Sequence, residues 1–269
     1  DEREIIVKKK VLIIVLFLIF LVPLFFIILQ SVAFSWRWPE LLPSEFSFRG
    51  WRALINEPRL GEALQSTILI GVAVVLLNFL IGIPAAKALA YYSFPGKNTI
   101  DVLLLSPILI PNLAIAMGLH FTFIRLGIAN HMLGVIFVHL IPTVPYTIRI
   151  FRGGFERIGD KWGEVGATLG ASSWQIFWTV QLPMMVPTIR SAAVLIFVIS
   201  LSQYALTALI GGGNIMTLAM LYFPYFQSND PAVLASFSAV FILFPIIFLI
   251  VLELILRLFL FRRRKVLSM

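Results

Sequence analysis

Residues 162–183, WGEVGATLGASSWQIFWTVQLP, form a polar, small-residue segment between long hydrophobic runs. Glu164 and Gln175 lie on either side of a Gly-Ala-Ser-Ser sequence, a composition that does not suit the hydrocarbon core of a membrane. We predict two short helices, over about 160–169 and from a Ser172 or Ser173 N-cap to about 181. Gly170 is expected to end the first helix with a positive φ, and Pro183 to stop the second.

The rest of the chain is strongly apolar, with a mean hydropathy of +0.98 over 269 residues. Runs of about 18 residues without charges indicate membrane-spanning helices. Six spans are expected, over residues 11–34, 63–92, 99–123, 131–149, 188–209 and 232–260. We therefore predict an all-α integral membrane protein in which residues 1–269 form one transmembrane domain. Residues 151–187 are expected to form the loop between the fourth and fifth spans.

Basic residues predict which side of the membrane this loop occupies. If the amino-terminal tail is cytoplasmic, the alternation of six spans places only five of the 21 Lys and Arg residues outside: Arg37, Arg49, Arg52, Arg59 and Arg125. Cytoplasmic loops carry an excess of Lys and Arg, so this orientation is the favoured one. Both termini and the 151–187 loop are thus expected on the cytoplasmic side of a bacterial inner membrane.

The net charge of +8 does not indicate nucleic-acid binding, because the basic residues cluster at the ends of spans. The absence of cysteine excludes thiolate metal sites and a cysteine nucleophile. His120, His131 and His139 do not have metal-ligand spacing. No bound metal and no catalytic residue is therefore expected.

The central segment resembles the EAA loop of the membrane permeases of binding-protein-dependent ABC importers. The matching positions are Glu164, the small residues Gly166 and Ala167, then Gly170 and Ala171, and finally Val180, Leu182 and Pro183. The family has two alanines and an isoleucine where this chain has Val165, Gly166 and Val180. The resemblance implies a fold of six transmembrane helices of the methionine-permease type.

The resemblance also implies that the loop forms a coupling helix, which docks in a groove of a separate ATPase subunit present in two copies. Glu164 would make a charged contact there, Gly166 and Ala167 would permit close docking, and Gly170 would set the angle between the two helices. The sequence contains no G-x-x-x-x-G-K-[ST] motif. The permease is therefore not expected to be an enzyme, and ATP with Mg²⁺ would be bound by the partner ATPase.

Further partners follow from the same resemblance. One chain of six spans implies a second permease subunit, expected to be a paralogue, and a periplasmic or lipid-anchored substrate-binding protein. The segment containing Ser202, Gln203 and Tyr204, followed by Gly211-Gly212-Gly213, resembles most the branch that imports polyamines, thiamine, iron(III) or phosphonates. Gly170→Asp is expected to leave expression intact but to uncouple transport from ATP hydrolysis.

A polar stripe on the fifth span is the candidate substrate pathway. Ser200, Gln203 and Thr207 recur at helical spacing, with Tyr204 beside them. Polar groups at this depth face the interior of the helix bundle or a pathway, so hydrogen bonding between helices is an equal alternative. Asn112, beside Pro111 in the third span, is a further candidate because the proline should break that helix.

Other function classes are weaker. An ion-coupled secondary transporter or channel would need ionisable residues within the membrane, and Asp101 and Glu253 both lie near span ends. An intramembrane protease is the enzyme alternative, but the Gly-x-Ser of residues 170–172 lies in the cytoplasmic loop without a neighbouring histidine. A purely structural membrane protein would not need the EAA-like pattern.

Overall fold

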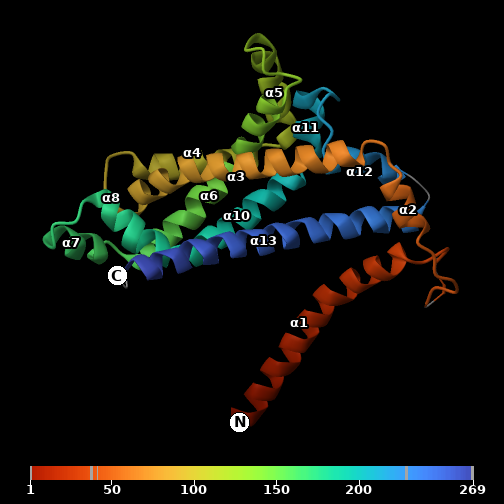
Figure 1. Ribbon diagram of the computed structural model, residues 1–269, viewed down its shortest axis with the longest axis horizontal. Helices are drawn as coiled ribbons and strands as arrows, with labels where there is room; N and C mark the ends of the chain where they lie inside the picture. Colours follow the sequence, from red (N-terminus) through yellow and green to blue (C-terminus); the bar gives the residue numbers. More distant parts are fainter. Residues whose placement is uncertain (1, 37–38, 41, 228–229, 268–269) are drawn as a thin grey trace. The chain divides into compact units, whose positions relative to one another are not determined.

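The computed structural model describes residues 2–36, 39–40, 42–227 and 230–267, without the side chains of residues 2, 3, 5, 105, 108, 227 and 259–267. The described chain is helical throughout, apart from loops and one isolated bridge between Ala33 and Phe46, so the predicted all-α fold is confirmed (Figure 1). Contacts divide it into two units. Unit 1 comprises Asp1–Leu60 and Leu221–Phe244, and unit 2 comprises Gly61–Met220 and Pro245–Met269.

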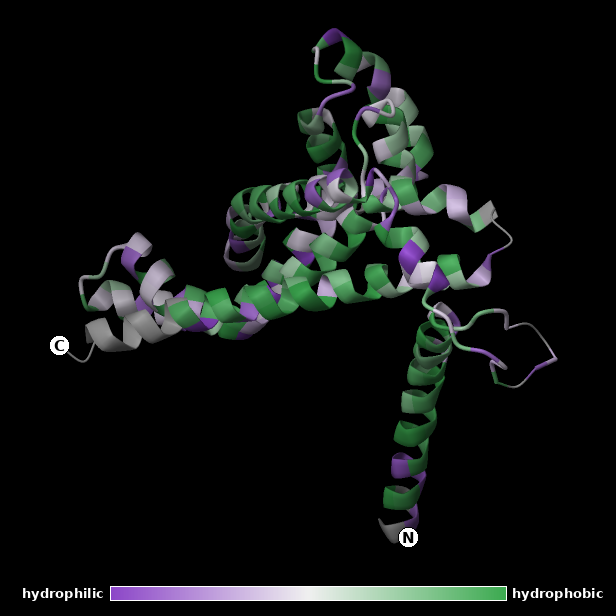
Figure 2. Ribbon diagram, turned by 45° about the vertical axis from the view of Figure 1, so that its right-hand side comes forward, coloured by the Kyte–Doolittle hydropathy of each residue, from purple (hydrophilic) through white to green (hydrophobic). Residues whose placement is uncertain are grey.

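Four helices of the described chain are long and apolar enough to cross a membrane. They are α1 (Glu2–Ser31), α3 (Leu60–Tyr91), α6 (Met132–Ile158) and α13 (Pro231–Leu267). A fifth is counted if the bent pair Ser173–Met184 and Val186–Leu201 is taken as one span. Figure 2 shows hydrophobic residues along most of the length of α1, as expected of a helix that faces lipid or other apolar surfaces.

The other two predicted spans are broken. The third is divided into α4 (Lys97–Leu109) and α5 (Asn112–Arg125), because Ile110 is extended before Pro111, which cannot donate a backbone hydrogen bond. The fifth is divided into α10 (Val186–Leu201) and α11 (Tyr204–Gly211). The break at residue 203 has no proline or glycine, and for this reason the sequence did not predict it.

Unit 1 is held by polar contacts between its two chain segments. The guanidinium of Arg49, at the start of α2 (Arg49–Ile55), donates to both oxygens of Asp230, over 2.6 and 3.0 Å. The Tyr225 hydroxyl of η2 (Phe223–Gln227) donates to the Glu57 carboxylate over 2.8 Å. Burial and this carboxylate raise the pKa of Tyr225, so its hydroxyl keeps its proton at neutral pH. The predicted basic residue Arg37 lies outside the described residues.

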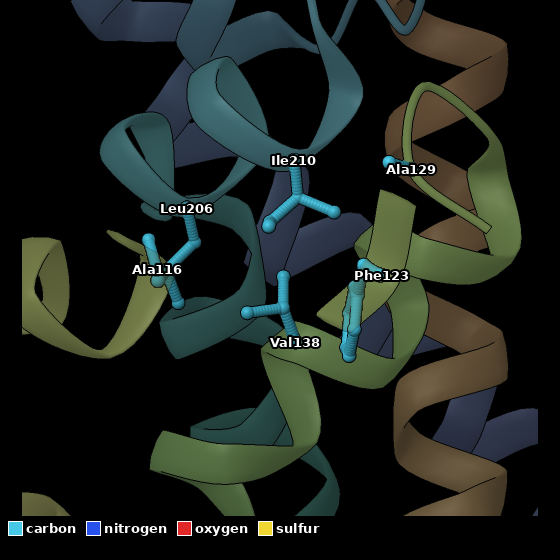
Figure 3. Close-up of a cluster of buried hydrophobic side chains, with 6 residues drawn as sticks. All are labelled: Ala116, Phe123, Ala129, Val138, Leu206 and Ile210. Atoms are coloured by element: carbon cyan, nitrogen blue, oxygen red, sulfur yellow. The ribbon is translucent and has the colours of Figure 1, made fainter. Parts of the chain in front are cut away.

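Small residues let the helices of unit 2 approach closely. A Cβ atom added at Gly71 of α3 would lie 2.6 Å from the Phe197 ring of α10. At Gly82 it would lie 2.5 Å from Thr147 of α6. Both positions therefore need a residue without a side chain for the helices to pack at this distance. Figure 3 shows another part of the core, in which α5, α6, α11 and the loop between α5 and α6 meet through six buried side chains: Ala116, Phe123, Ala129, Val138, Leu206 and Ile210.

Gly71→Ala should destabilise unit 2, since the new methyl group overlaps the Phe197 ring. Overpacking of this kind costs about 1–3 kcal/mol. Gly118→Ala is the matched control, because nothing lies within 4 Å of its Cβ position in α5. Thermal unfolding in detergent should show a lower Tm for Gly71→Ala and an unchanged or slightly higher Tm for Gly118→Ala. Equal Tm values for the two variants would contradict the packing assigned to Gly71.

Candidate functional site

The segment over residues 161–184, called the elbow here, begins with two short helices joined by a tight turn. α7 (Lys161–Thr168) is followed by Gly170 with a φ of +79°, a conformation that costs glycine little. α8 (Ser173–Ile176) begins at Ser172, whose hydroxyl accepts from the Gln175 amide while the Gln175 side chain accepts from the Ser172 amide. The predicted Gly170 turn and Ser172 N-cap are confirmed, and the reciprocal contact is a capping box.

The two helices pack against each other through a position without a side chain. A Cβ atom at Gly166 would lie 2.7 Å from the Ile176 side chain, which is buried. The amide of Ala171 donates to the Gly166 carbonyl and that of Gly170 to the Ala167 carbonyl, both over 3.0 Å. Gly166 was expected to permit docking of a partner, but the structure places it inside the elbow. It fixes how close α7 lies to α8.

The second half of the elbow continues beyond the predicted stop. A π-helix, η1 (Phe177–Gln181), follows α8, and α9 (Leu182–Met184) contains Pro183. The prediction that Pro183 ends the helix is therefore wrong. The chain instead bends at Met185, and Val186–Leu201 runs at 74° to Ser173–Met184. Val180, Leu182 and Pro183 are partly buried at this junction.

The outer face of the elbow is apolar and open. Trp162 and Val165 of α7 and its C-cap Leu169 recur at helical spacing and are 49, 52 and 82% exposed. No residue of α7 is buried, and Ala167 is exposed. Glu164 is exposed as well and has no ion-pair or hydrogen-bond partner for its side chain in the described chain. An apolar stripe beside an unpaired carboxylate is the composition of a protein-docking surface.

Ser172→Ala should weaken the elbow, because it removes the acceptor for the Gln175 amide. Loss of an N-cap costs about 1 kcal/mol, whereas Ser172→Asp keeps a capping oxygen. Amide hydrogen exchange over residues 173–176 should be several-fold faster in the alanine variant and near the wild-type rate in the aspartate variant. If Ser172 were instead the nucleophile of a protease, both variants would lose all proteolytic activity.

The candidate pathway residues lie around the two helix breaks. The Asn112 side chain, at the first residue of α5, donates to the Gln203 side chain over 3.3 Å. Gln203 lies in the break between α10 and α11 and is buried. The structure thus brings together two residues that are 91 positions apart in the sequence. Asn112 is exposed, and Tyr204 is partly buried.

Ser200 and Thr207 are placed differently. Each lies within 3.0 Å of a ring nitrogen of His139, a residue of α6 that is 1% exposed. From the sequence, His139 was considered only as a possible metal ligand, and its contact with Ser200 and Thr207 was not predicted. A signal was present, since His139, Thr143 and Thr147 recur at every fourth residue of the part of α6 that carries no charge, residues 132–148. Thr143 and Thr147 both contact the Asn78 side chain of α3, over 2.8 Å.

Both acids of the apolar runs are paired. The Asp101 carboxylate accepts two hydrogen bonds from Arg152, over 2.7 and 2.9 Å. Glu253 lies 2.7 Å from Arg190 and 2.9 Å from Arg257. Asp101 and Arg152 join α4 to α6, and Glu253 and Arg190 join α13 to α10. Glu253 and Arg257 lie on successive turns of α13. Within the described residues, neither acid is therefore a free ion-binding group.

Known proteins similar to this chain include membrane permeases of transport systems. Residues 78–265 match the family described as the binding-protein-dependent transport system inner membrane component. A molybdate/tungstate transport system permease protein of Thermococcus kodakarensis is 33% identical over 149 residues, which are 55% of this chain and 60% of the relative. A sulfate transport system permease protein of Escherichia coli is 25% identical over 240 residues, which are 83% of this chain and 82% of the relative.

The matched part spans about 60% of the length of the archaeal molybdate/tungstate relatives. Among solved structures, a chain of a bacterial ABC transporter that imports the polysaccharide alginate has a TM-score of 0.72. That match covers 93% of this chain and 96% of the other at 18% identity. At this identity the structural likeness establishes the fold.

Proposed function

Because this chain belongs to the family of binding-protein-dependent transport system inner membrane components, we propose that it is the permease of an ATP-driven importer of a small oxyanion. The observation that carries this proposal is the open face of α7, where Trp162, Val165 and Leu169 lie beside the unpaired Glu164. A monomeric soluble surface would rarely expose such a stripe, so a partner protein is expected to cover it.

The partner proposed for this face is an ATPase subunit in two copies, each binding ATP and Mg²⁺. The sequence has no P-loop, so the energy for uphill transport would come from that partner. Glu164 is expected to contact a basic residue of the ATPase. Closure of the two ATPase copies would then move α7.

The structure offers a rigid connection from α7 to the spans. The capping box and the contact between Gly166 and Ile176 hold α7 against α8. The helical run from Ser173 to Met184 then meets α10 at the 74° bend. Met185 at this bend is 1% exposed, so the connection is packed and can transmit a displacement to α10. The expected result is a tilt of the spans between inward- and outward-facing states.

The substrate class proposed here differs from the branch favoured by the sequence alone. The relatives described above are named for molybdate, tungstate and sulfate, whereas the sequence had favoured polyamines, thiamine, iron(III) or phosphonates. We therefore propose an inorganic tetrahedral oxyanion in place of those four substrates. Ser200 and Thr207 are buried against His139, which leaves as pathway candidates the neutral hydrogen-bonding residues Asn112, Gln203 and Tyr204. Such groups can solvate an anion in transit without the strong attraction of a cation.

The importer is proposed to contain further subunits. A second permease subunit, expected to be a paralogue, would complete the pathway, and a periplasmic or lipid-anchored binding protein would deliver the substrate. Both termini and the elbow are proposed to face the cytoplasm, as the distribution of basic residues favours.

An ion-coupled secondary transporter or channel is the alternative. It would need an acid that is free to bind an ion within the membrane. Asp101 and Glu253 are held by Arg152, and by Arg190 and Arg257, respectively. These pairs favour a structural role for both acids.

Uptake by the reconstituted assembly tests the proposal. The chain, its ATPase, the second permease and the binding protein would be placed in proteoliposomes, and accumulation of molybdate, tungstate and sulfate would be measured. We expect uptake that requires ATP and the binding protein. Uptake without the ATPase, driven by an ion gradient, would overturn the importer, while ATP-driven uptake of a polyamine instead would overturn the oxyanion.

A further inference from the structure

The break between α10 and α11 lies where the proposed pathway residues gather. α10 ends at Leu201 and α11 begins at Tyr204, and Gln203 between them leaves the helical conformation with φ −80° and ψ +78°. A break within the membrane leaves backbone groups that need partners other than water. Since neither Pro nor Gly occupies residues 200–204, something else must hold the chain in this conformation.

His139 spans the break from the neighbouring helix α6. Its Nδ1 atom lies 3.0 Å from the Ser200 hydroxyl, before the break, and its Nε2 atom lies 3.0 Å from the Thr207 hydroxyl, after it. His139, Ser200 and Thr207 are 1, 5 and 0% exposed. One buried ring therefore fixes the distance between the last turn of α10 and the first turn of α11. We call these three residues the His139 clasp.

The hydrogen bonds of the clasp have a definite direction. The Thr207 hydroxyl donates its one hydrogen to the Gln203 carbonyl, so it must accept from His139 Nε2. A neutral imidazole carries one N–H, which places it on Nε2 and makes Nδ1 an acceptor. Ser200 then donates to Nδ1. The chain of bonds runs from Ser200 through the ring and Thr207 to the backbone carbonyl of Gln203.

This series of hydrogen bonds ends at the carbonyl of Gln203, and the side chain of the same residue contacts the break between α4 and α5. The Gln203 side chain accepts from Asn112, which follows the α4–α5 break at Pro111. Fixing the Gln203 backbone therefore also fixes where the two broken helices meet. The Asn78 contacts to Thr143 and Thr147 lie on the same helix α6 but join it to α3, and neither involves a residue of the two breaks.

We propose that His139 is a positioning residue for transport, whose clasp holds the α10–α11 break so that Gln203 and Asn112 meet the passing substrate. This inference rests on the proposed function, because it assigns the substrate to those two side chains. His139 itself does not touch the substrate, since its ring is buried and both ring nitrogens are engaged.

If His139 had only a structural role, the clasp would serve only to give three buried polar side chains hydrogen-bond partners. Replacing all of them by apolar groups of similar shape removes the donors and acceptors of the clasp together, and only the Gln203 carbonyl loses a donor, so the fold should tolerate it. The triple variant His139→Leu, Ser200→Ala, Thr207→Val makes this test. The matched control is Asn78→Leu, Thr143→Val, Thr147→Val, which removes an equally buried polar group between α3 and α6.

Both triple variants would be studied in the complete reconstituted assembly, with molybdate as the probe. We expect each to assemble and to unfold within a few degrees of the wild type. The clasp variant should lose at least about tenfold in maximal uptake per ATP hydrolysed, and the control should keep the wild-type ratio. Amide exchange over residues 200–208 should be about tenfold faster in the clasp variant alone. Wild-type uptake and exchange in the clasp variant would overturn the proposal.

Single substitutions decide the matter if the triple variant does not fold. The amide of His139→Gln lies where the ring has Nε2, so it can bond Thr207 but not Ser200. The amide of His139→Asn lies where the ring has Nδ1, so it can bond Ser200 but not Thr207. Because the Thr207 bond leads to the Gln203 carbonyl, we expect His139→Gln to retain more uptake than His139→Asn. Equal losses would contradict the clasp. If the wild-type assembly takes up no oxyanion, the proposed function fails, and the exchange rates over residues 200–208 alone decide whether His139 holds the break.

Discussion

Leu169→Asp is expected to abolish ATP-driven uptake while leaving the permease folded. Leu169 directly follows α7 as its C-cap and is 82% exposed, so a charge there meets water in the isolated chain. In the proposed complex the same side chain is buried against the ATPase, where an unpaired carboxylate is costly. Loss of a central apolar contact of this kind costs about 2–4 kcal/mol, on the order of 30- to 700-fold in affinity.

The measurement is co-purification of the ATPase with the variant, together with uptake and Tm. Leu169→Met is the conservative control and should retain the ATPase. Leu126→Asp is the positional control, since Leu126 is 65% exposed at the end of α5, far along the chain from the elbow. If Leu169→Asp retains the ATPase at the wild-type level, α7 is not the docking surface.

Substitutions at Gly170 are expected to uncouple ATP hydrolysis from uptake in a graded series. The φ of +79° is costly for a β-branched residue, less costly for aspartate and least for asparagine. Nothing lies within 4 Å of the Cβ position, so the backbone and not a clash sets the order. Gly170→Val should lose most uptake, Gly170→Asp an intermediate amount and Gly170→Asn the least.

The readout is the ratio of molybdate transported to ATP hydrolysed in proteoliposomes. The strain amounts to about 1–2 kcal/mol for an ordinary residue, so the variants should express and assemble normally. Gly153→Val is a control in α6, where no atom lies within 4 Å of the Cβ position and φ is not positive. Equal coupling ratios for Gly170→Val and Gly170→Asn would show that the turn conformation does not matter.

The elbow could be predicted well because its signals are local. Gly170 and the pair Ser172 and Gln175 each act on residues within one helical turn, so spacing alone locates the turn and the N-cap. Pro183 was misread because a proline can be accommodated in a helix when the preceding turn widens. The π-helix of residues 177–181 lies directly before it.

The site around the helix breaks was less accessible to sequence reasoning. Pro111 predicts the break between α4 and α5. The break between α10 and α11, at Gln203, depends on contacts with His139 from another helix. The contact between Asn112 and Gln203 likewise joins distant positions. The similarity to relatives named for molybdate, tungstate and sulfate was not predicted, because the short glycine and serine motifs at residues 202–213 carry little information about substrate charge.

Cysteine cross-linking tests the central claim most directly, because the 269-residue sequence has no cysteine of its own. Leu169→Cys would be treated with a short photoactivated thiol cross-linker in the assembled transporter. Leu109→Cys, at an equally exposed position of 83%, is the control on α4. We predict that Leu169→Cys cross-links to the ATPase and that Leu109→Cys does not. Failure of Leu169→Cys to cross-link, or its labelling by a membrane-impermeant thiol reagent from the periplasmic side, would contradict the account.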